Sequence, residues 1–516
     1  METISCRSNR FPLKITLPIL AVFITLLACQ QSAPGGSAPW DINSQASPQI
    51  AGGPVTRTPF LPATRPPNAP ILSPTPDAPH PVPSLRAEAE QYVVQPGDSL
   101  GKIAQRYGLR MEDIVQANNI DNPNLLAVGQ TLTIPVPPPS GLGSDFKIIP
   151  DSELVYGPAS TSLDISKFIQ NKNGYLAHFE EKVDDKVMTG DQIVARIAYE
   201  YSVNPRLLLA VLEYQSGWVT KTNPDPTTHT YPIGISESSR KGLYRQLAWA
   251  ANNLNRGYYL WRVNAVGHWL LKDGSIVPVA STINAGTAGI QQMFALLYDR
   301  EHWDLAVSEN GLFTIYQKFF GYPFDYAIDP ILPPDLSQPS LQLPFEPGLD
   351  WAFTGGPHGG WGDGSAWAAL DFAPPGGAHG CVSSDAWEVT VADGLIVRAA
   401  DGEVVQDLDG DGFEQTGWTI LYMHVESRDR VQAGTYLKAG ERIGHPSCEG
   451  GYSTGTHLHL ARRYNGEWIP ADQNLPFVMG GWVSQGTGIE YEGYLERDGQ
   501  KVEAWEGDVP QNKIHR

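Results

Sequence analysis

Histidine is concentrated in the C-terminal third of the chain. Six of the 12 histidines lie between residues 358 and 459. The densest point is the segment 455–460, Gly-Thr-His-Leu-His-Leu, in which one leucine separates His457 from His459. Alternate residues of a β-strand point to the same face of a sheet. We therefore expect the two imidazoles to enter one site, which indicates metal binding or catalysis rather than packing.

Two further histidines and a carboxylate lie upstream of this pair. His424 ends the strand-like run 417–424, and His358 precedes Asp371, which lies in the segment 369–374, Ala-Leu-Asp-Phe-Ala-Pro. Two imidazoles and a carboxylate suit Zn²⁺, and a catalytic zinc site keeps one position open for water. The helical His-Glu-x-x-His pattern does not occur in the sequence. The combination predicts a zinc site that is built on strands.

These residues together resemble the lysostaphin-like (LytM-type) family of zinc endopeptidases, which cut the cross-bridges and stems of peptidoglycan. The resemblance covers about residues 350–475 and implies a mainly antiparallel β-sheet domain. It implies zinc ligation by His358, Asp371 and His459, and assistance to the reaction by His457 and His424. The family usually places the first ligand histidine only a few residues before the aspartate. Here residues 359–370 intervene, so we expect a looped-out pair.

The resemblance also implies a reaction, the hydrolysis of a peptide bond by a water that zinc activates. A neutral imidazole of His457 or His424 would take a proton from that water and return one to the leaving amine. Histidine suits both transfers because its ordinary pKa lies near neutrality.

Two other features fall within this part of the chain. Cys381 and Cys448 are the two cysteines outside the N-terminal segment, which we expect to act as an export signal. In an exported protein, a disulfide between them is favoured over zinc–thiolate ligation. Asp407, Asp409 and Asp411 resemble the start of a calcium loop, but Trp418 occupies the position of the expected bidentate glutamate. We therefore favour a polar hairpin tip there, with Ca²⁺ binding as the alternative.

Proline-rich stretches separate the folded units. Residues 29–90 have neither helical nor strand periodicity, which predicts a disordered, extended linker. Similar breaks near residues 135–139 and 330–344 bound three units, at 91–136, 160–330 and 345–500. The expected fold class is therefore a multidomain α and β protein.

The N-terminus predicts export. Basic residues precede an apolar run that ends at residue 28, which is shorter than the about 20 apolar residues of a membrane span. We expect a signal peptide over 1–28. Leu26-Leu27-Ala28-Cys29 resembles the lipobox of bacterial lipoproteins, which implies lipid attachment at Cys29 and a tether on the outer face of the cytoplasmic membrane or in the cell envelope. An ordinary signal with an incidental cysteine is the alternative.

The first unit, 91–136, shows the order strand, helix, helix, strand. A strand-like run begins at Tyr92, helical periodicity follows Leu100 and Leu109, and a second strand precedes Pro135. The whole stretch resembles a LysM module, which implies binding to the glycan strands of peptidoglycan or chitin. A small fold without glycan affinity is the alternative.

The middle unit, 160–330, is helical in periodicity and resembles lysozyme or a soluble lytic transglycosylase. Such enzymes place a catalytic glutamate directly before a serine, but Gln215 precedes Ser216 here, and the nearest carboxylate is Glu213. Glu213 is therefore either the acid in a shifted register or evidence of lost catalysis. We favour an all-α domain that binds glycan or serves as a scaffold.

The formal net charge of −20 argues against nucleic acid as a partner, because phosphate binding needs clustered cations. The sequence thus predicts an exported zinc endopeptidase that is targeted to peptidoglycan. Two alternatives stay open: a catalytically silent envelope scaffold or amidase activator, and a glycoside hydrolase that acts through Glu213.

Overall fold

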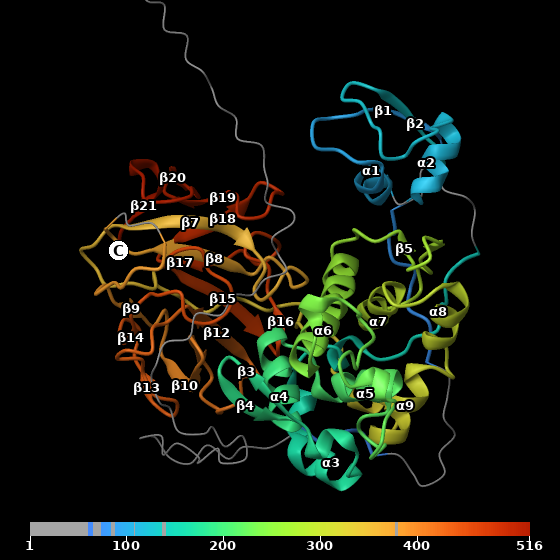
Figure 1. The fold of residues 1–516 in the computed structure, drawn as a ribbon. Helices are drawn as coiled ribbons and strands as arrows, with labels where there is room; N and C mark the ends of the chain where they lie inside the picture. The colour runs from blue at the N-terminus through green and yellow to red at the C-terminus, as the bar shows by residue number, and fades with distance from the viewer. Residues whose placement is uncertain (1–59, 65–73, 84–87, 108, 137–140, 377–379) are drawn as a thin grey trace, which may run out of the picture.

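The computed structural model describes residues 60–64, 74–83, 88–107, 109–136, 141–376 and 380–516 (Figure 1). The expected signal peptide 1–28, the expected lipid-attachment residue Cys29 and most of the expected linker 29–90 lie outside these ranges. Within them, no helix combines the length and the apolar composition that crossing a bilayer requires.

The N-terminal module has the predicted order of elements. Its two strands pair antiparallel, with Tyr92 opposite Leu132, and two short helices connect them. Leu100, Ile103 and Ile114 are buried, as their helical spacing predicts. The elements are β1 (Glu90–Val93), α1 (Leu100–Tyr107), α2 (Met111–Asn118) and β2 (Thr131–Ile134).

A hairpin of the helical region packs against the apolar core of this N-terminal module. The hairpin consists of β5 (His268–Leu270) and β6 (Ile276–Pro278). Ile276 is 3% exposed and belongs to the apolar core of the module, with Leu270 packed against it. The module is therefore attached to the rest of the molecule by apolar packing as well as by the chain.

The middle region consists of seven α-helices and two short hairpins among the described residues, so it is helical but not purely α. The helices are α3 (Ile165–Lys172), α4 (Gly190–Tyr201), α5 (Pro205–Ser216), α6 (Leu243–Arg262), α7 (Ala285–Ala295), α8 (Arg300–Ala306) and α9 (Leu312–Phe320). The sequence predicts neither of the two hairpins. One is β5–β6, and the other pairs β3 (Glu180–Val183) with β4 (Lys186–Thr189). Its turn is made by Asp184 and Asp185, both with positive φ, a conformation that short polar side chains tolerate.

Local sequence explains the ends of α5. The side chain of Asn204 accepts a hydrogen bond from the backbone N–H of Arg206, and Pro205 occupies the first helical position. Gly217 ends the helix in the left-handed region, at φ 71°. Both ends of the helix thus follow from the conformational preferences of these residues.

Part of the expected linker lies against the helical region. The imidazole of His80 stacks on Trp261 with ring centroids 4.4 Å apart, and its Nε2 donates to the carbonyl oxygen of Trp261 at 2.9 Å. The backbone N–H of Asp77 donates to the carbonyl of Thr282. Residues 74–83 are therefore held by specific contacts and differ from the disordered chain that their composition predicts.

The C-terminal region is built around a nine-stranded antiparallel sheet (Figure 1). In order across the sheet, its strands are β13 (Tyr436–Leu437), β10 (Gly394–Ala400), β11 (Glu403–Asp407), β12 (Trp418–Met423), β15 (Leu458–Tyr464), β8 (Ala369–Ala373), β7 (Trp351–His358) and β21 (Lys513–Ile514), and β16 (Glu467–Trp468) pairs with β15. Two smaller sheets accompany it, β9 (Glu388–Val389) with β14 (Arg442–Gly444), and β17 (Val478–Met479), β18 (Trp482–Gly486), β19 (Gly493–Arg497) and β20 (Gln500–Glu503).

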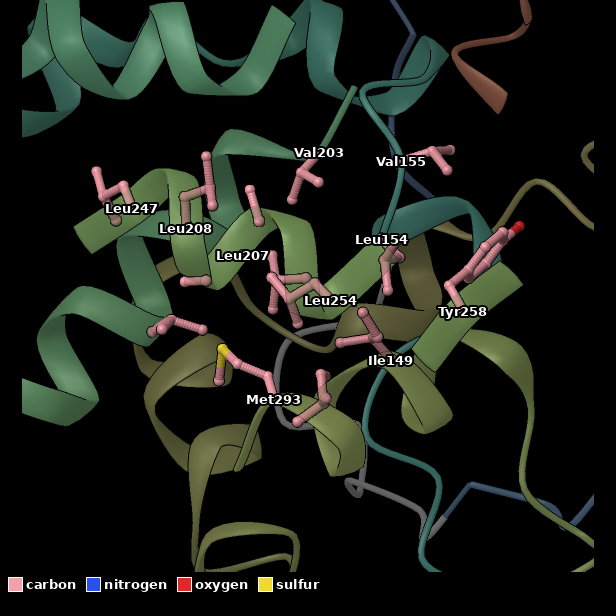
Figure 2. Packing of buried hydrophobic residues seen from close by; sticks show 14 of the residues in the cluster. Ile149, Leu154, Val155, Val203, Leu207, Leu208, Leu247, Leu254, Tyr258 and Met293 are labelled. Carbon is pink, nitrogen blue, oxygen red and sulfur yellow. The ribbon is translucent and has the colours of Figure 1, made fainter. Parts of the chain in front are cut away.

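Both faces of the large sheet are covered. Leu421 and Ala461 belong to a core that they share with the helical region, whereas their neighbours Ile420 and Leu460 belong to a second core. This alternation is the period of a strand. Figure 2 shows the helical side of the shared core, where Leu207, Leu254 and Met293 pack together with Ile149 and Leu154. The middle and C-terminal units, expected to be separated at residues 330–344, are thus packed on one another.

Buried polar contacts join these two units. The hydroxyl of Tyr258 on α6 donates to Glu467 Oε2 at 3.1 Å, and the backbone N–H of Trp468 donates to the hydroxyl of Tyr259 at 3.0 Å. Both contacts are buried, so they are made in a region of low dielectric where a lost partner is costly.

Candidate metal centre

The site begins with one row of residues that runs across four neighbouring strands. Met423 on β12 lies opposite His459 on β15, His459 lies opposite Asp371 on β8, and Asp371 lies opposite Gly355 on β7. This row lies on the face of the sheet that carries Ala461, because His459 and Ala461 are two residues apart. The antiparallel register therefore places an imidazole and a carboxylate side by side.

His358, the last residue of β7, completes a buried trio. His358 Nε2 lies 3.0 Å from His459 Nδ1, and each of these two nitrogens lies 3.2 Å from Asp371 Oδ1. The residues are 2%, 5% and 8% exposed for His358, His459 and Asp371, respectively. One donor atom from each lies within 4.8 Å of the others. The structure thus brings together the three residues that the sequence predicts as ligands.

The tautomers of the two imidazoles follow from their backbone contacts. His358 Nδ1 is 2.8 Å from the carbonyl oxygen of Gly356, and His459 Nε2 is 3.1 Å from that of Gly360. A carbonyl oxygen only accepts, so each of these ring nitrogens carries the proton. The opposite nitrogens, which face Asp371, are therefore lone pairs in the neutral rings.

With both rings neutral, this arrangement leaves three acceptors facing one another with no hydrogen between them. Asp371 Oδ1 is buried and has no hydrogen-bond partner among the described residues. Close lone pairs and a carboxylate repel one another unless a cation or an added proton lies between them. Hydrogen bonds from the outer ring nitrogens to carbonyls are the usual support for metal-binding histidines. The residues present therefore fit a Zn²⁺ ion.

The other two predicted histidines lie beside this trio. The sequence predicts that His457 lies within the strand, but it directly precedes the observed strand β15, and its Nε2 is 3.7 Å from Asp371 Oδ1. The rings of His424 and His457 have centroids 4.5 Å apart. Their Nδ1 atoms donate to the carbonyl oxygens of Glu449, at 3.0 Å, and Gly455, at 2.7 Å. In the tautomer that these contacts set, Nε2 carries the lone pair of each neutral ring.

Burial and neighbouring charges give Asp371 and His424 different charge states. Burial raises the pKa of Asp371, but the attraction of its carboxylate to protonated His358 and His457 and its hydrogen bonding to His358 and His459 outweigh burial and hold this pKa well below its usual range. Burial, helped by the charges of His457 and His459, holds the pKa of His424 well below its ordinary value. At neutral pH, Asp371 is thus a carboxylate and His424 is a neutral imidazole.

The residues inserted between His358 and Asp371 have a clear position. They form a loop against α6, where the backbone N–H of Gly364 donates to the side-chain oxygen of Asn252 at 3.0 Å. A Cβ on Gly364 would lie 1.9 Å from the backbone oxygen of Asn252. The same loop supplies Gly360, the hydrogen-bond partner of His459. The looped-out pair is therefore supported by the helical region.

Cys381 and Cys448 form the predicted disulfide. The acidic group Asp407, Asp409 and Asp411 comes together, but the carboxylate of Asp407 accepts three backbone hydrogen bonds from its own loop, as a polar turn requires. Tyr491, which sequence reasoning did not select, stacks on His358 with ring centroids 4.2 Å apart. Its position in the short connection between β18 and β19 gave no periodic pattern from which to predict this contact.

Glu213 lies in the helical region, and its carboxylate accepts hydrogen bonds from the segment that follows α5. Its Oε2 accepts hydrogen bonds from the backbone N–H groups of Val219 and Thr220, both at 3.1 Å, and its Oε1 accepts one from the Thr220 hydroxyl at 2.5 Å. These bonds hold the chain that leaves α5. Gln215, which precedes Ser216, accepts a hydrogen bond from the Tyr298 hydroxyl.

Comparison with known proteins identifies two domains of the chain. Residues 147–332 match the family model described as LasA, N-terminal domain, and residues 92–135 match that of the LysM domain. The chain is 26% identical over 301 residues to protease LasA of Pseudomonas aeruginosa. The match covers 52% of this chain and 65% of that protein. The chain thus contains matches to a LasA N-terminal domain and to a LysM domain, and it is similar to protease LasA. It spans just under two thirds of the length of LasA. The helical region, expected to resemble lysozyme, matches a domain named for LasA instead.

Other similarities are local. A stretch of 45 residues is 49% identical to the cortical fragment-lytic enzyme of Bacillus subtilis and covers 9% of this chain and 10% of that protein. The solved M23 metalloprotease pseudoalterin is 22% identical, with a TM-score of 0.28, and the match covers 35% of this chain and all of that one. The catalytic domain of lysostaphin from Staphylococcus simulans is 26% identical, with a TM-score of 0.17, over 24% of this LasA-like chain and 88% of that one.

Proposed function

We propose that this LasA-like protein is a zinc endopeptidase that hydrolyses peptide bonds of bacterial peptidoglycan. The observation that carries the proposal is the convergence of His358 Nε2, His459 Nδ1 and Asp371 Oδ1, at 3.0 and 3.2 Å from one another. These three atoms are the proposed zinc ligands. Bound there, Zn²⁺ would supply a Lewis acid that polarises a peptide carbonyl and lowers the pKa of water to about 7.

His424 and His457 are the proposed proton carriers. Each has Nδ1 fixed by a carbonyl oxygen, so each presents Nε2 as a base. The low pKa of His424 keeps that imidazole unprotonated at neutral pH. The side chain of His457 is 17% exposed, more than those of the proposed ligands. His457 therefore serves as the group that meets the attacking water or the leaving amine, with His424 next to it.

The LysM domain supports peptidoglycan as the substrate, because it provides affinity for glycan strands next to a peptidase. Binding to the polymer raises the local concentration of peptide bonds without changing the chemical step. Lipid attachment at Cys29 belongs to the same proposal and would hold the enzyme at the membrane surface in the cell envelope.

The experiment is digestion of purified peptidoglycan sacculi, followed by separate assays of new amino groups and new sugar ends. We expect new amines, no new reducing or anhydro-sugar ends, and loss of the amines with a zinc chelator. Release of sugar ends that depends on Glu213 would support the glycoside hydrolase alternative. The absence of both new amines and new sugar ends would support the scaffold alternative.

A second assay separates targeting from chemistry. Deletion of residues 91–136 should reduce retention on insoluble sacculi while the turnover of a short soluble peptide stays within about twofold. Since Ile276 packs against this domain, the melting temperature of the deletion variant must be measured alongside. A large loss of peptide turnover in a folded variant would contradict the separation of roles.

A further inference from the structure

One residue links the backbones of the two histidines that are not proposed ligands. The backbone N–H of Ser447 donates to the carbonyl oxygen of His424 at 2.7 Å, and its carbonyl oxygen accepts from the backbone N–H of His457 at 3.3 Å. Ser447 and His457 form an isolated antiparallel bridge. His424 and His457 are 33 residues apart in sequence, so this bridge is a direct connection between them.

The residues around Ser447 also hold the imidazole of His424. The hydroxyl of Ser447 donates to the His424 carbonyl oxygen at 2.7 Å and accepts from the backbone N–H of Glu449 at 3.0 Å. The carbonyl oxygen of Glu449 in turn accepts from His424 Nδ1 at 3.0 Å. Ser447 and Glu449 thus fix His424 at both its backbone and its ring.

His424 needs such support because its backbone is strained. Its φ is +70°, in the left-handed region that non-glycine residues rarely occupy. A conformation of this kind costs of order 1–3 kcal/mol and persists where surrounding contacts over-determine it. Two hydrogen bonds from Ser447 to one carbonyl oxygen are contacts of that kind.

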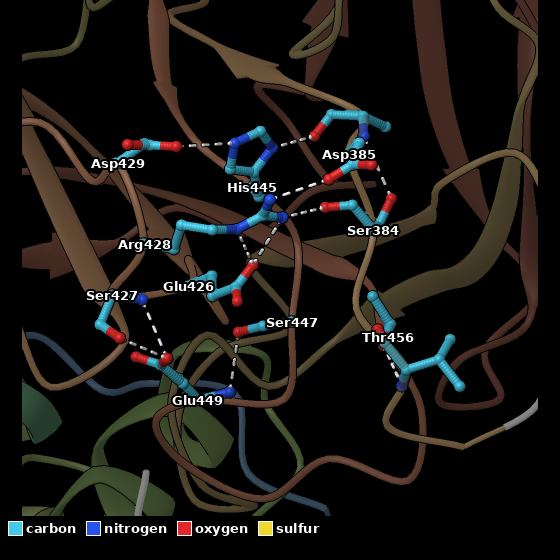
Figure 3. A network of polar contacts seen from close by, with 12 residues as sticks. Ser384, Asp385, Glu426, Ser427, Arg428, Asp429, His445, Ser447, Glu449 and Thr456 are labelled. Atoms are coloured by element: carbon cyan, nitrogen blue, oxygen red, sulfur yellow. Dashed lines mark hydrogen bonds and ion pairs between the residues drawn. The ribbon is translucent and has the colours of Figure 1, made fainter. Parts of the chain in front are cut away.

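Side chains on a neighbouring loop secure the segment further. Oε1 of Glu449 accepts hydrogen bonds from the backbone N–H and the hydroxyl of Ser427, both at 2.9 Å. Figure 3 shows Glu449 between Ser427 and Ser447, next to the ion pairs of Arg428 with Glu426 and Asp385. The position of the Glu449 carbonyl, and with it the orientation of the His424 ring, is therefore set by the loop 426–430.

The disulfide ties this segment to the chain before His457. Cys448 lies between Ser447 and Glu449, and its partner Cys381 lies between Gly380 and Val382. The Gly380 carbonyl oxygen accepts from the backbone N–H of Thr456 at 3.1 Å. The backbone N–H of Val382 donates to the Thr456 hydroxyl at 2.9 Å. Thr456 directly precedes His457, so the disulfide joins the supports of both histidines.

We propose that Ser447–Glu449, tied to Cys381 by the disulfide, is a positioning element that holds His424 and His457 in register with each other. The proposal rests on the peptidase function proposed above. Within the part of the chain that the structure describes, the side-chain hydrogen bonds of Ser447, Cys448 and Glu449 go to residues other than the proposed ligands, so these three residues act through the two histidines. Their loss should lower the rate of the chemical step and leave zinc binding intact.

The test compares three variants of the full chain on a soluble peptide. Ser447→Ala should lower kcat about tenfold, with KM within twofold and one zinc per chain. Ser447→Thr keeps the hydroxyl and should restore most of kcat. The double change Cys381→Ser with Cys448→Ser should lower kcat at least as much as Ser447→Ala, again at full zinc content.

A matched control is available on the helical region. The hydroxyl of Ser308 donates to the carbonyl oxygen of Leu305 at 2.8 Å and accepts from the backbone N–H of Asn310 at 3.2 Å, the same pattern as Ser447. Ser308→Ala should leave kcat unchanged. Where the cysteine variant does not fold, the pair Ser447→Ala and Ser447→Thr decides the question alone.

The outcomes distinguish this proposal from the proposed function. A wild-type protein that binds zinc and cleaves the peptide, with Ser447→Ala at wild-type kcat, overturns the positioning role only. Loss of zinc from Ser447→Ala overturns it too, because the element would then support the metal. A wild-type protein without peptidase activity overturns the proposed function itself.

Discussion

Asp371 and His459 face each other on the neighbouring strands β8 and β15, with Asp371 Oδ1 3.2 Å from His459 Nδ1. The pair is created by the register of the sheet and needs no loop to bring the two residues together. On the other side of Asp371, the opposite residue on β7 is Gly355. A site built on three adjacent strands is as rigid as the sheet that carries it.

Gly355 leaves room for the Asp371 carboxylate. A Cβ at this position would lie 2.7 Å from Asp371 Oδ2 and 3.0 Å from Asp371 Cβ. Gly355→Ala should therefore displace the carboxylate and weaken zinc binding by about 10–100-fold, the range for groups that orient a ligand. Zinc titration against a competing chelator measures this. Gly141→Ala is the control, since its Cβ would meet only the end of the Arg300 side chain, at 3.9 Å; an equal loss in both variants would contradict the steric argument.

The apolar core behind the sheet contains an unpaired acid. Glu388 on β9 is fully buried, and neither of its carboxylate oxygens has a hydrogen-bond partner among the described residues. Burial raises its pKa well above the usual value. The folded state therefore keeps a proton that the unfolded state releases. The stability from this group is complete below the unfolded pKa and is lost as pH rises toward the folded pKa, by up to about 1.4 kcal/mol per pH unit.

Glu388→Gln removes this titration and should make the protein more stable than wild type at pH 7, with a smaller difference at pH 4. Urea denaturation at several pH values measures the two free energies of unfolding. Glu503→Gln, on the exposed side of β20, is the matched control and should not change the pH dependence. A wild-type advantage over Glu388→Gln at pH 7 would show that the acid has a partner.

Glu213 gives a prediction about the helical region. Its carboxylate holds the N–H groups of Val219 and Thr220. Glu213→Ala should lower the free energy of unfolding by about 1–3 kcal/mol, because donors lose their acceptor. It should not change peptide turnover or the release of sugar ends at a temperature where the variant is folded. A stable variant that loses sugar-end release would restore the glycosidase interpretation.

The packing of the helical region on the sheet is tested at Gly364. The Cβ of alanine would overlap the backbone oxygen of Asn252, at 1.9 Å. Backbone atoms of α6 have little freedom to move, so Gly364→Ala should destabilise the contact between loop and helix and lower the melting temperature by several degrees. Differential scanning calorimetry measures the shift, and an unchanged melting temperature would contradict the close packing.

The predictable parts of the fold are those that local chemistry determines. Asn204 and Pro205 begin α5 and Gly217 ends it, as capping rules require. The alternation in 455–460 correctly indicates a strand and a shared site, although His457 itself precedes β15. The trio of His358, Asp371 and His459 could be predicted because the residue types and the family resemblance agreed.

The remaining features depend on contacts between segments that are distant in sequence. Composition predicts a free linker at residues 74–83, but the stacking of His80 on Trp261 depends on the fold of α6. Likewise, the sequence around Leu421 and Ala461 does not predict that the helices pack on this face of the sheet. A strand that is buried on both faces lacks the alternation of apolar and polar residues that would distinguish its two faces. The bridge through Ser447 is made by backbone groups, which leave no trace in side-chain patterns.

Zinc stoichiometry in two histidine variants tests the central claim most directly. His459→Ala removes a proposed ligand, whereas His457→Ala removes a proposed proton carrier that lies two residues away. Purified full-length variants are dialysed against trace zinc, and metal content and peptide turnover are measured on the same samples. We predict that His459→Ala loses both zinc and activity, and that His457→Ala keeps about one zinc per chain while turnover falls by about 10²–10⁴-fold. Full zinc occupancy in His459→Ala would contradict the assignment of the metal centre.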